Sequence, residues 1–415
     1  MRLTDAEKMM LAGDLGEPRR LAIEQQLKVG EFFDAEDFVE VRQAHIMADT
    51  EALGEAGVEW LERLASHPED QCRVKVPTLT DPRGADFATY ERIRQDPSIV
   101  ELERRAVRAL RALGVLMTDT CIPYQTVMAP VRGEHLAYGD TGVVIYVNSV
   151  LGARSNYEGG PAAVSAALTG RTPRYGFHLD QHRRGAIRFV IEDQLREFND
   201  WGALGGVIGR QMGSYWEVPV IEGVDDPPGS DQLKHFGAAL ASFGSTAMFH
   251  MVGVTPEAPD LVSVFDGGPP EPLVISRADI ESFQAGYRLP DDRVDVVVFA
   301  APQLSLMELS ALADLLDGRR VHSEITLLAA TSPENKAAAD RMGLSQTIED
   351  AGGILLSGVC FYQMHARQLA EANGWIRLMT NSAKLVNIIG GYGYEPLLAS
   401  MEACVERACR GKVVR

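Results

Sequence analysis

The most constraining feature of the sequence is a regular alternation of apolar strands and capped helices in its C-terminal part. Four short apolar runs are typical of buried strands: residues 296–299, 325–328, 354–356 and 378–379. A capping box formed by Ser305 and Glu308 begins one of the intervening helices, and Pro333 begins the next. Strands that alternate with helices pair in a parallel sheet with right-handed crossovers. We therefore expect an α/β fold.

The ends of these strands are the expected place for a ligand. An open parallel sheet binds its ligands beyond the carboxyl ends of its strands. The segments that follow the four runs are residues 300–303, 331–332, 358–360 and 381–382. We expect all four segments to gather at one edge of the sheet.

The upstream sequence predicts further helices and strands and a division into domains. We expect a helix that begins at the capping box Ser98–Glu101 and ends at Gly114, buried strands at residues 115–117 and 143–147, and a helix at residues 161–168. The length of 415 residues predicts two or three domains, and the turn-rich segment 222–229 is the expected joint. We expect an N-terminal α/β region over residues 1–222, a middle α/β segment over 230–290 and a C-terminal βαβ domain over 291–415.

Composition narrows the class of protein. With 40 Lys and Arg against 58 Asp and Glu, the formal net charge is −18, which argues against binding nucleic acid or an anionic membrane by bulk charge. No apolar run approaches the length of about 18 residues that a membrane span needs. The first seven residues lack the apolar core of a secretion signal, so we expect a cytoplasmic protein. Five cysteines without a CxxC pair argue against a disulfide framework.

The densest candidate site is the segment 148–161, which leads into the N-terminus of an expected helix. Exposed backbone N–H groups at such an end favour an anion, and Gly159 and Gly160 let the backbone approach a ligand closely. Arg154 could form two parallel hydrogen bonds to a carboxylate or a phosphate. A turn with a surface arginine explains the same residues equally well, so both interpretations stay open.

Single polar residues beside apolar runs are further candidates. Cys121 and Cys360 each follow such a run, where a thiolate can bind a metal or act as a nucleophile, although buried cysteines are usually inert. His45 is either an acid–base group or a structural histidine. Asn381 and Ser382 offer an amide and a hydroxyl at the start of a helix, where the same residue types also serve as plain N-caps.

Taken together, five motifs resemble the aconitase X family. They lie at residues 133–135, 148–161, 168–173, 253–258 and 380–384. The resemblance extends from Leu3 and Thr4 through residues 43–46 to the C-terminal helix, which is nearly the whole chain. It implies an aconitase-like, multi-domain α/β body of parallel and mixed sheets flanked by helices, with hydro-lyase activity. The small swivelling domain of the family is lacking, so the resemblance implies a separate small subunit and a heterodimer.

The resemblance also implies an iron centre held by cysteines. Cys121 matches the cysteine of the family's Thr-Cys-x-Pro-Tyr stretch and Cys360 matches a late cysteine, so both are expected metal ligands. Ala301 stands where some relatives have a third cysteine. This disfavours a three-cysteine [3Fe-4S] or [4Fe-4S] cluster. A [2Fe-2S] iron–sulfur cluster or a mononuclear iron remains, with loss of the centre as the alternative.

Further site residues are expected because they fall in matched motifs. Two are expected to be catalytic, namely Ser382 and His45. Four are expected to bind the substrate, namely Ser149, Arg154, Asn156 and Asn381. The closing domain of aconitase relatives makes the small subunit an alternative source of the catalytic base.

The favoured activity is dehydration of cis-3-hydroxy-L-proline to Δ1-pyrroline-2-carboxylate, because the missing third cysteine fits that branch of the family. The reaction removes a proton beside a carboxylate and expels hydroxide from the neighbouring carbon, and an iron Lewis acid would assist both steps. Two alternatives are the large subunit of a mevalonate 5-phosphate dehydratase and a non-catalytic paralogue that binds a small acid.

Overall fold

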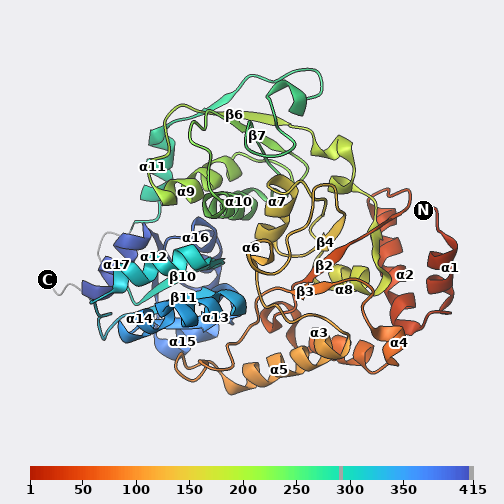
Figure 1. Cartoon of the computed structure of the whole chain (residues 1–415), viewed down its shortest axis with the longest axis horizontal. Helices are drawn as coiled ribbons and strands as arrows, with labels where there is room; N and C mark the ends of the chain where they lie inside the picture. Colours follow the sequence, from red (N-terminus) through yellow and green to blue (C-terminus); the bar gives the residue numbers. More distant parts are fainter. Residues whose placement is uncertain (289–292, 411–415) are drawn as a thin grey trace.

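Three parallel sheets, each packed against helices, form the body of the chain (Figure 1). The computed structural model describes residues 1–288 and 293–410, and the expected domain boundary at residues 290–291 lies outside them. An antiparallel pair of short strands, β1 (Phe38–Glu40) and β5 (Arg171–Pro173), accompanies the three sheets. The expected α/β fold is confirmed.

The C-terminal sheet has the strand order β12-β11-β10-β13-β14, and every neighbouring pair is parallel. Its strands are β10 (Val296–Leu304), β11 (Thr326–Thr331), β12 (Ile354–Ser357), β13 (Arg377–Thr380) and β14 (Glu395–Leu398). Its helices are α12 (Leu306–Leu316), α13 (Pro333–Met342), α14 (Leu344–Asp350), α15 (Ala366–Asn373), α16 (Ala383–Ile389) and α17 (Met401–Arg410). The four expected strands are confirmed. The strand order reverses at β10, so the crevice beyond β10 and β13 is the place where such a sheet binds ligands.

The N-terminal sheet has the parallel order β3-β2-β4. Its strands are β2 (Gln43–Ile46), β3 (Thr78–Thr80) and β4 (Leu136–Tyr138). The helices of this part are α1 (Asp5–Ala12), α2 (Glu17–Phe32), α3 (Thr50–Ala65), α4 (Glu69–Cys72), α5 (Pro97–Ala112), α6 (Pro123–Thr126), α7 (Thr141–Ser149) and α8 (Gly160–Thr169). Helix α8 confirms the helix expected at residues 161–168. Helix α5 confirms the helix expected near Ser98, but Asp96 caps it by accepting a hydrogen bond from Ser98 N at 2.8 Å.

The strand expected at residues 143–147 is wrong, because these residues lie in α7. Asp140 caps this helix by accepting a hydrogen bond from Val143 N at 3.0 Å. Helix α7 is buried from Gly142 to Ser149, so it has no polar face. A continuous apolar run of this length does not distinguish a buried helix from a buried strand.

The strand expected at residues 115–117 is also wrong. These residues form a single bridge, between Leu116 and Leu79 of β3. Leu116 is 48% exposed, which a strand in the middle of a sheet would not allow. The segment therefore runs along the edge of the N-terminal sheet and leads into the loop that carries Cys121.

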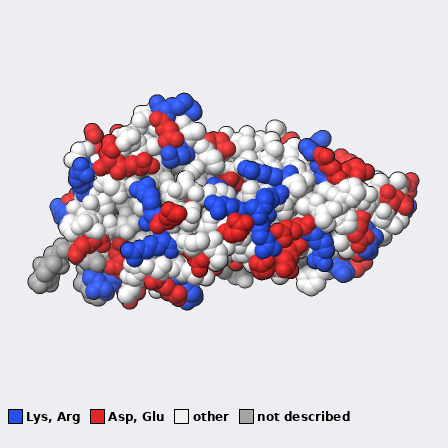
Figure 2. Space-filling model, turned by 90° about the horizontal axis from the view of Figure 1, so that it is seen from below, with Lys and Arg blue, Asp and Glu red and all other residues white. Residues whose placement is uncertain are grey.

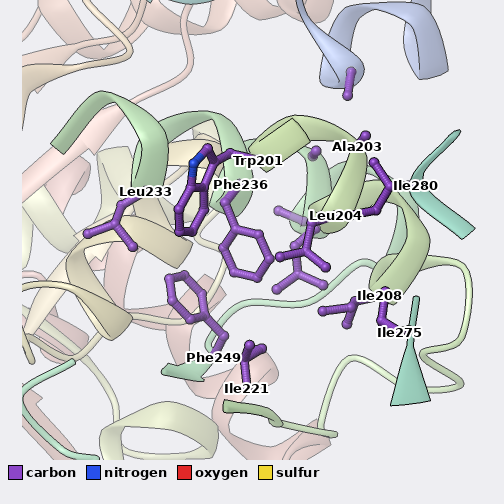
Figure 3. Packing of buried hydrophobic residues seen from close by; sticks show 14 of the residues in the cluster. Trp201, Ala203, Leu204, Ile208, Ile221, Leu233, Phe236, Phe249, Ile275 and Ile280 are labelled. Carbon is purple, nitrogen blue, oxygen red and sulfur yellow. The ribbon is translucent and has the colours of Figure 1, made fainter. Parts of the chain in front are cut away.

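The middle sheet has the parallel order β8-β7-β6-β9. Its strands are β6 (Ile187–Ile191), β7 (Pro219–Glu222), β8 (His250–Met251) and β9 (Leu273–Ile275), and its helices are α9 (Phe198–Gly209), α10 (Ser230–Gly244) and α11 (Arg277–Ala285). Trp201, Leu204, Phe236 and Phe249 belong to its core (Figure 3). A Cβ atom at Gly205 would stand 2.3 Å from the Phe236 carbonyl oxygen, so glycine permits the close contact of α9 and α10. The segment 222–229, expected as a joint, connects β7 to α10 at this sheet.

Short 3-10 helices complete the described elements, at Gly176–His178, Asp180–Arg183, Val262–Val264, Phe361–Gln363 and Gly390–Tyr392. Charged side chains of both signs are interspersed over the face shown in Figure 2. Exposed ion pairs of this kind, such as Arg108 with Glu101, contribute little stability. Within residues 1–288 and 293–410, no helix combines the length and the apolar character that crossing a membrane requires.

Candidate functional site

The segments that follow strands of the C-terminal sheet gather at one edge, as expected. The Gln303 side-chain amide, near the end of β10, donates hydrogen bonds to Thr331 O at 3.2 Å and Val359 O at 3.1 Å. Ser382 Oγ, after β13, donates to Ala301 O at 2.5 Å. These contacts connect all four of the segments that the strand-end argument selected.

The same edge meets the N-terminal sheet. Arg83, which follows β3, forms a parallel bridge with Val359, and its backbone N donates to Gly358 O at 2.9 Å. The Gln303 amide also reaches Asp119 O at 3.2 Å. The ends of two parallel sheets therefore face each other, and residues from both can contribute to one site.

Cys121 and Cys360 lie side by side at this junction. The two thiols are within hydrogen-bond reach, although one belongs to the N-terminal part and the other follows β12. They are 5% and 1% exposed, respectively. The hydrogen bond to Cys360 and burial together raise the pKa of Cys121 well above its ordinary value. Both effects favour the protonated thiol over the thiolate.

Four ionisable side chains accompany the cysteines, each at the end of a strand or in the following helix. His45 lies in β2, one residue before its end, Asp81 follows β3, Asp140 follows β4, and Lys384 lies in α16. His45 Nε2 donates to Thr120 O at 2.9 Å and lies 3.6 Å from Asp81 Oδ1. Lys384 Nζ donates to Asp140 Oδ2 at 3.1 Å.

The electrostatics of this cluster follow from burial and pairing. Burial lowers the pKa of His45, so its imidazole is neutral. Burial also raises the pKa of Asp81 well above its ordinary value, and the nearby Asp140 raises it further. Burial opposes the Lys384 charge, but Asp140 and the two cysteines outweigh it and raise the pKa of Lys384. Lys384 therefore keeps a cation beside the thiols at any physiological pH.

A second group of buried carboxyls lies behind the cluster. Gln363 Nε2 donates to Asp81 Oδ2 at 2.7 Å and to Asp49 Oδ2 at 3.2 Å. Glu103 accepts hydrogen bonds from Thr50 N at 3.1 Å and Thr50 Oγ at 2.8 Å. Burial raises the pKa values of Asp49 and Glu103 to about 7 each. These carboxyls exchange protons near neutral pH.

Ser382 and Asn381, two of the expected site residues, lie at this edge in different environments. Ser382 Oγ donates to Ala301 O and accepts from Leu385 N at 3.0 Å, so it caps α16 and its hydroxyl hydrogen is already donated. Asn381 is 5% exposed and its Nδ2 has no hydrogen-bond partner. Asn381 also lines a cavity of about 650 Å³ between the middle and C-terminal parts.

The other three expected substrate-binding residues lie outside the cysteine cluster. Ser149 Oγ accepts from Phe249 N at 2.9 Å, and Asn156 Nδ2 donates to Tyr175 O at 3.1 Å. Arg154 donates to His178 O at 3.0 Å and forms an ion pair with Asp180. These contacts fix the turns of the segment 148–161. A substrate-binding role for the three residues stays a prediction.

Sequence reasoning did not select Asp81, Asp140, Lys384 or Gln303. A signal for Asp81 and Asp140 was present, because each follows a short strand of the N-terminal sheet. Lys384 ends the motif at residues 380–384, where only its neighbours were chosen. Asp140 and Lys384 are 244 residues apart in sequence, so their pairing is a property of the tertiary structure alone.

The donor set fits a metal held by two thiolates. Across the described ranges, no group of three or more His, Cys, Asp or Glu side chains is arranged to hold a metal ion. Ala301 packs in the same apolar cluster as Cys360 and supplies no donor atom from its side chain. Two adjacent cysteines beside a lysine can hold a soft cation and leave its other coordination positions to non-protein ligands. A cluster that needs three cysteines does not fit these residues.

Comparison with known proteins places this geometry in a family. Sequence models of the aconitase X first, second and third domains match residues 1–181, 185–285 and 294–410. The crystal structure of aconitase X from Thermococcus kodakaraensis in its holo-form superposes with a TM-score of 0.88 at 28% identity, covering 98% of this chain and 100% of that one.

Two named relatives have different substrates. The phosphomevalonate dehydratase large subunit of Methanosarcina mazei is 34% identical, covering 99% of this chain and 98% of that protein. The cis-3-hydroxy-L-proline dehydratase of Pseudomonas aeruginosa is 32% identical, covering 99% of this chain and 70% of that protein. The chain belongs to the aconitase X family and is a hydro-lyase, that is, a dehydratase.

Proposed function

We propose that the chain is the large subunit of a cis-3-hydroxy-L-proline dehydratase, with an iron centre bound by Cys121 and Cys360. The observation that carries the proposal is the adjacency of these two buried thiols beside a buried lysine. Cysteine thiolates are the usual protein ligands of iron–sulfur clusters. The two-cysteine donor set favours a mononuclear iron or a [2Fe-2S] cluster completed by non-protein ligands.

The charge around the thiols supports the choice of substrate. Three carboxyls lie there, those of Asp81, Asp119 and Asp140, and two cations, Lys384 and Arg83, pair with Asp140 and Asp119. Both cations are already engaged: Lys384 pairs with Asp140, and Arg83 Nε lies 3.0 Å from Asp119 Oδ2. Each of these cations is balanced by one carboxylate, so a phosphate dianion would find no uncompensated positive charge, whereas a zwitterionic imino acid carries its own compensating ammonium. The site therefore suits hydroxyproline better than mevalonate 5-phosphate.

Lys384 and His45 have different roles in the proposed reaction. Lys384 has three N–H donors and gives one to Asp140, which leaves donors for the substrate carboxylate and for the charge that develops beside it. The carbonyl of Thr120 can only accept, so His45 Nε2 carries the proton of the neutral imidazole. His45 Nδ1 then holds a lone pair with no partner, and it can take the proton from C2 of the substrate.

The remaining steps complete the elimination. The bond between C3 and its hydroxyl oxygen breaks, a double bond forms between C2 and C3, and the hydroxyl takes up a proton and leaves as water. The resulting enamine becomes Δ1-pyrroline-2-carboxylate when the ring nitrogen loses its proton and C3 gains one. Bound iron would supply Lewis acidity toward the hydroxyl and the carboxylate. Burial of His45 and Lys384 keeps bulk water away from the developing carbanion.

We also propose a separate small subunit as partner. The relative from Methanosarcina mazei is named a large subunit, and the chain spans 70% of the longer Pseudomonas aeruginosa relative. A closing partner would complete the substrate enclosure, as lids do in other enzymes.

The proposal is tested by supplying both substrates to the assembled enzyme. The chain is co-purified with its small subunit without oxygen and assayed for formation of Δ1-pyrroline-2-carboxylate and for loss of mevalonate 5-phosphate. We expect turnover of cis-3-hydroxy-L-proline alone. Turnover of mevalonate 5-phosphate alone would refute the choice of substrate, and turnover of neither compound would favour a non-catalytic paralogue.

A further inference from the structure

Gln303 connects the loops that carry the two cysteines. It lies near the end of β10, at the point where the strand order of the C-terminal sheet reverses, and it is 0% exposed. Its Oε1 accepts a hydrogen bond from Cys121 N at 3.3 Å. Its Nε2 lies 3.1 Å from the carbonyl oxygen of Val359, the residue directly before Cys360.

The same amide group makes further contacts that fix its orientation. Nε2 also lies 3.2 Å from both Asp119 O and Thr331 O, so its two hydrogens serve three carbonyls. All of these acceptors are backbone oxygens, and the group that meets Oε1 is a backbone N–H. A carboxylate cannot donate, and an apolar side chain can neither donate nor accept. Only an amide of this length satisfies both loops.

The backbone of Gln303 is held as firmly as its side chain. Its N–H points at Cys121 Sγ, with a nitrogen-to-sulfur distance of 3.4 Å. Its carbonyl accepts from Lys234 Nζ at 3.3 Å, and Lys234 is itself fixed by Asp231 at 3.1 Å and by Glu308. Hydrogen bonds to a ligating sulfur tune the properties of a metal centre. The Gln303 N–H is placed to do so at Cys121.

We infer that Gln303 is a positioning residue that sets the spacing of the Cys121 and Cys360 thiols for a shared metal ion. The inference rests on the proposed function, because it assumes that the two thiols ligate together. Ala301 lies two residues before Gln303 in β10, and within residues 1–288 and 293–410 no group of three or more His, Cys, Asp or Glu side chains is arranged to hold a metal ion. The geometry of the two thiols therefore depends on the groups that hold their loops. Such outer partners typically change metal affinity by about ten- to a hundredfold when they are removed.

The test is a cadmium titration of the reduced, metal-free full-length chain. Cd²⁺ prefers thiolates, and its thiolate absorbance reports ligation directly without any need for activity. Two variants remove the donors of the amide: Gln303→Met is apolar, and Gln303→Glu keeps the shape and an acceptor for Cys121 N. Gln26→Met is the matched control. Gln26 is 3% exposed and also bridges backbone and side-chain groups, at Arg171 O and Thr169 Oγ, but it lies away from the cysteines.

We expect both Gln303 variants to bind Cd²⁺ at least about tenfold more weakly than wild type, and Gln26→Met to bind as wild type does. Equal affinity in all proteins would overturn the inference and leave the proposed function intact. Absence of a cadmium–thiolate signal in wild type would refute the metal centre of the proposed function, and the inference with it. If neither Gln303 variant unfolds cooperatively while Gln26→Met still unfolds cooperatively, Gln303 has a purely structural role and the inference is wrong.

Discussion

Variants of the buried ion pair between Lys384 and Asp140 allow the contribution of Lys384 to folding stability to be measured separately from its contribution to catalysis. At their distance of 3.1 Å and an effective dielectric constant of about 20, Coulomb's law gives an attraction of about 5 kcal/mol. Both side chains are at most 4% exposed, so removal of one partner leaves a buried charge without compensation. Lys384→Met should therefore lower the free energy of unfolding by about 3–5 kcal/mol.

The double variant Lys384→Met/Asp140→Asn should recover most of this loss. It removes both charges, and asparagine can still cap α7 as Asp140 does. We expect its free energy of unfolding to lie within about 1 kcal/mol of wild type, as found for other buried ion pairs that are replaced whole. Urea unfolding of the four proteins of the cycle measures the coupling directly.

Activity should not recover with stability. If Lys384 stabilises the charge that develops at the substrate, the double variant should retain native stability but lose about a hundredfold or more in kcat. A double variant that is stable and nearly as active as wild type would refute the role assigned to Lys384. A coupling energy near zero would refute the buried ion pair itself.

Two further predictions concern single positions. Burial raises the pKa of Glu103 from 4.5 to about 7, so the stability that this carboxyl contributes is present below about pH 4.5 and is lost as the pH rises to 7. The free energy of unfolding of Glu103→Gln, measured in urea, should therefore gain about 3 kcal/mol relative to wild type between pH 4.5 and 8, whereas Glu62→Gln, whose exposed carboxyl has a lowered pKa, should show no such gain. A difference between Glu103→Gln and wild type that does not vary with pH would contradict this reasoning. Ala301→Cys adds a thiol to the cluster that contains Cys360, so it should strengthen Cd²⁺ binding and increase the thiolate absorbance per bound ion; an unchanged spectrum would show that position 301 does not face the site.

Much of the fold could be predicted from the sequence, because the C-terminal part contains clear local signals for where its strands and helices begin. The Ser305–Glu308 capping box and Pro333 begin helices where expected, because the groups that satisfy a helix end lie within three residues of it. Residues 143–147 were wrongly predicted as a strand because α7 is buried on all sides. A helix without a polar face does not show the alternation of apolar and polar residues that identifies a helix in a sequence. Where an element is buried on all sides, its apolar run alone therefore does not separate a helix from a strand.

The site was predictable in part. The strand-end rule and the family resemblance together selected Cys121, Cys360 and His45, which the fold brings together. Neither argument could pair Lys384 with Asp140, because that contact arises only when two sheets meet. The segment 148–161 was predicted to be a possible anion-binding site because it contains turn-forming glycines and an arginine, residue types that also occur in such sites. In the structure, Arg154 is engaged with Asp180.

The most direct test of the central claim is the iron content of the anaerobically purified complex in matched cysteine variants. Cys121→Ser removes a proposed ligand, and Cys72→Ser removes another buried cysteine that lies far from the site in the α4 region. The account predicts iron in the wild type and in Cys72→Ser, and its loss from Cys121→Ser. Equal iron in all three proteins, or none in any of them, would contradict it.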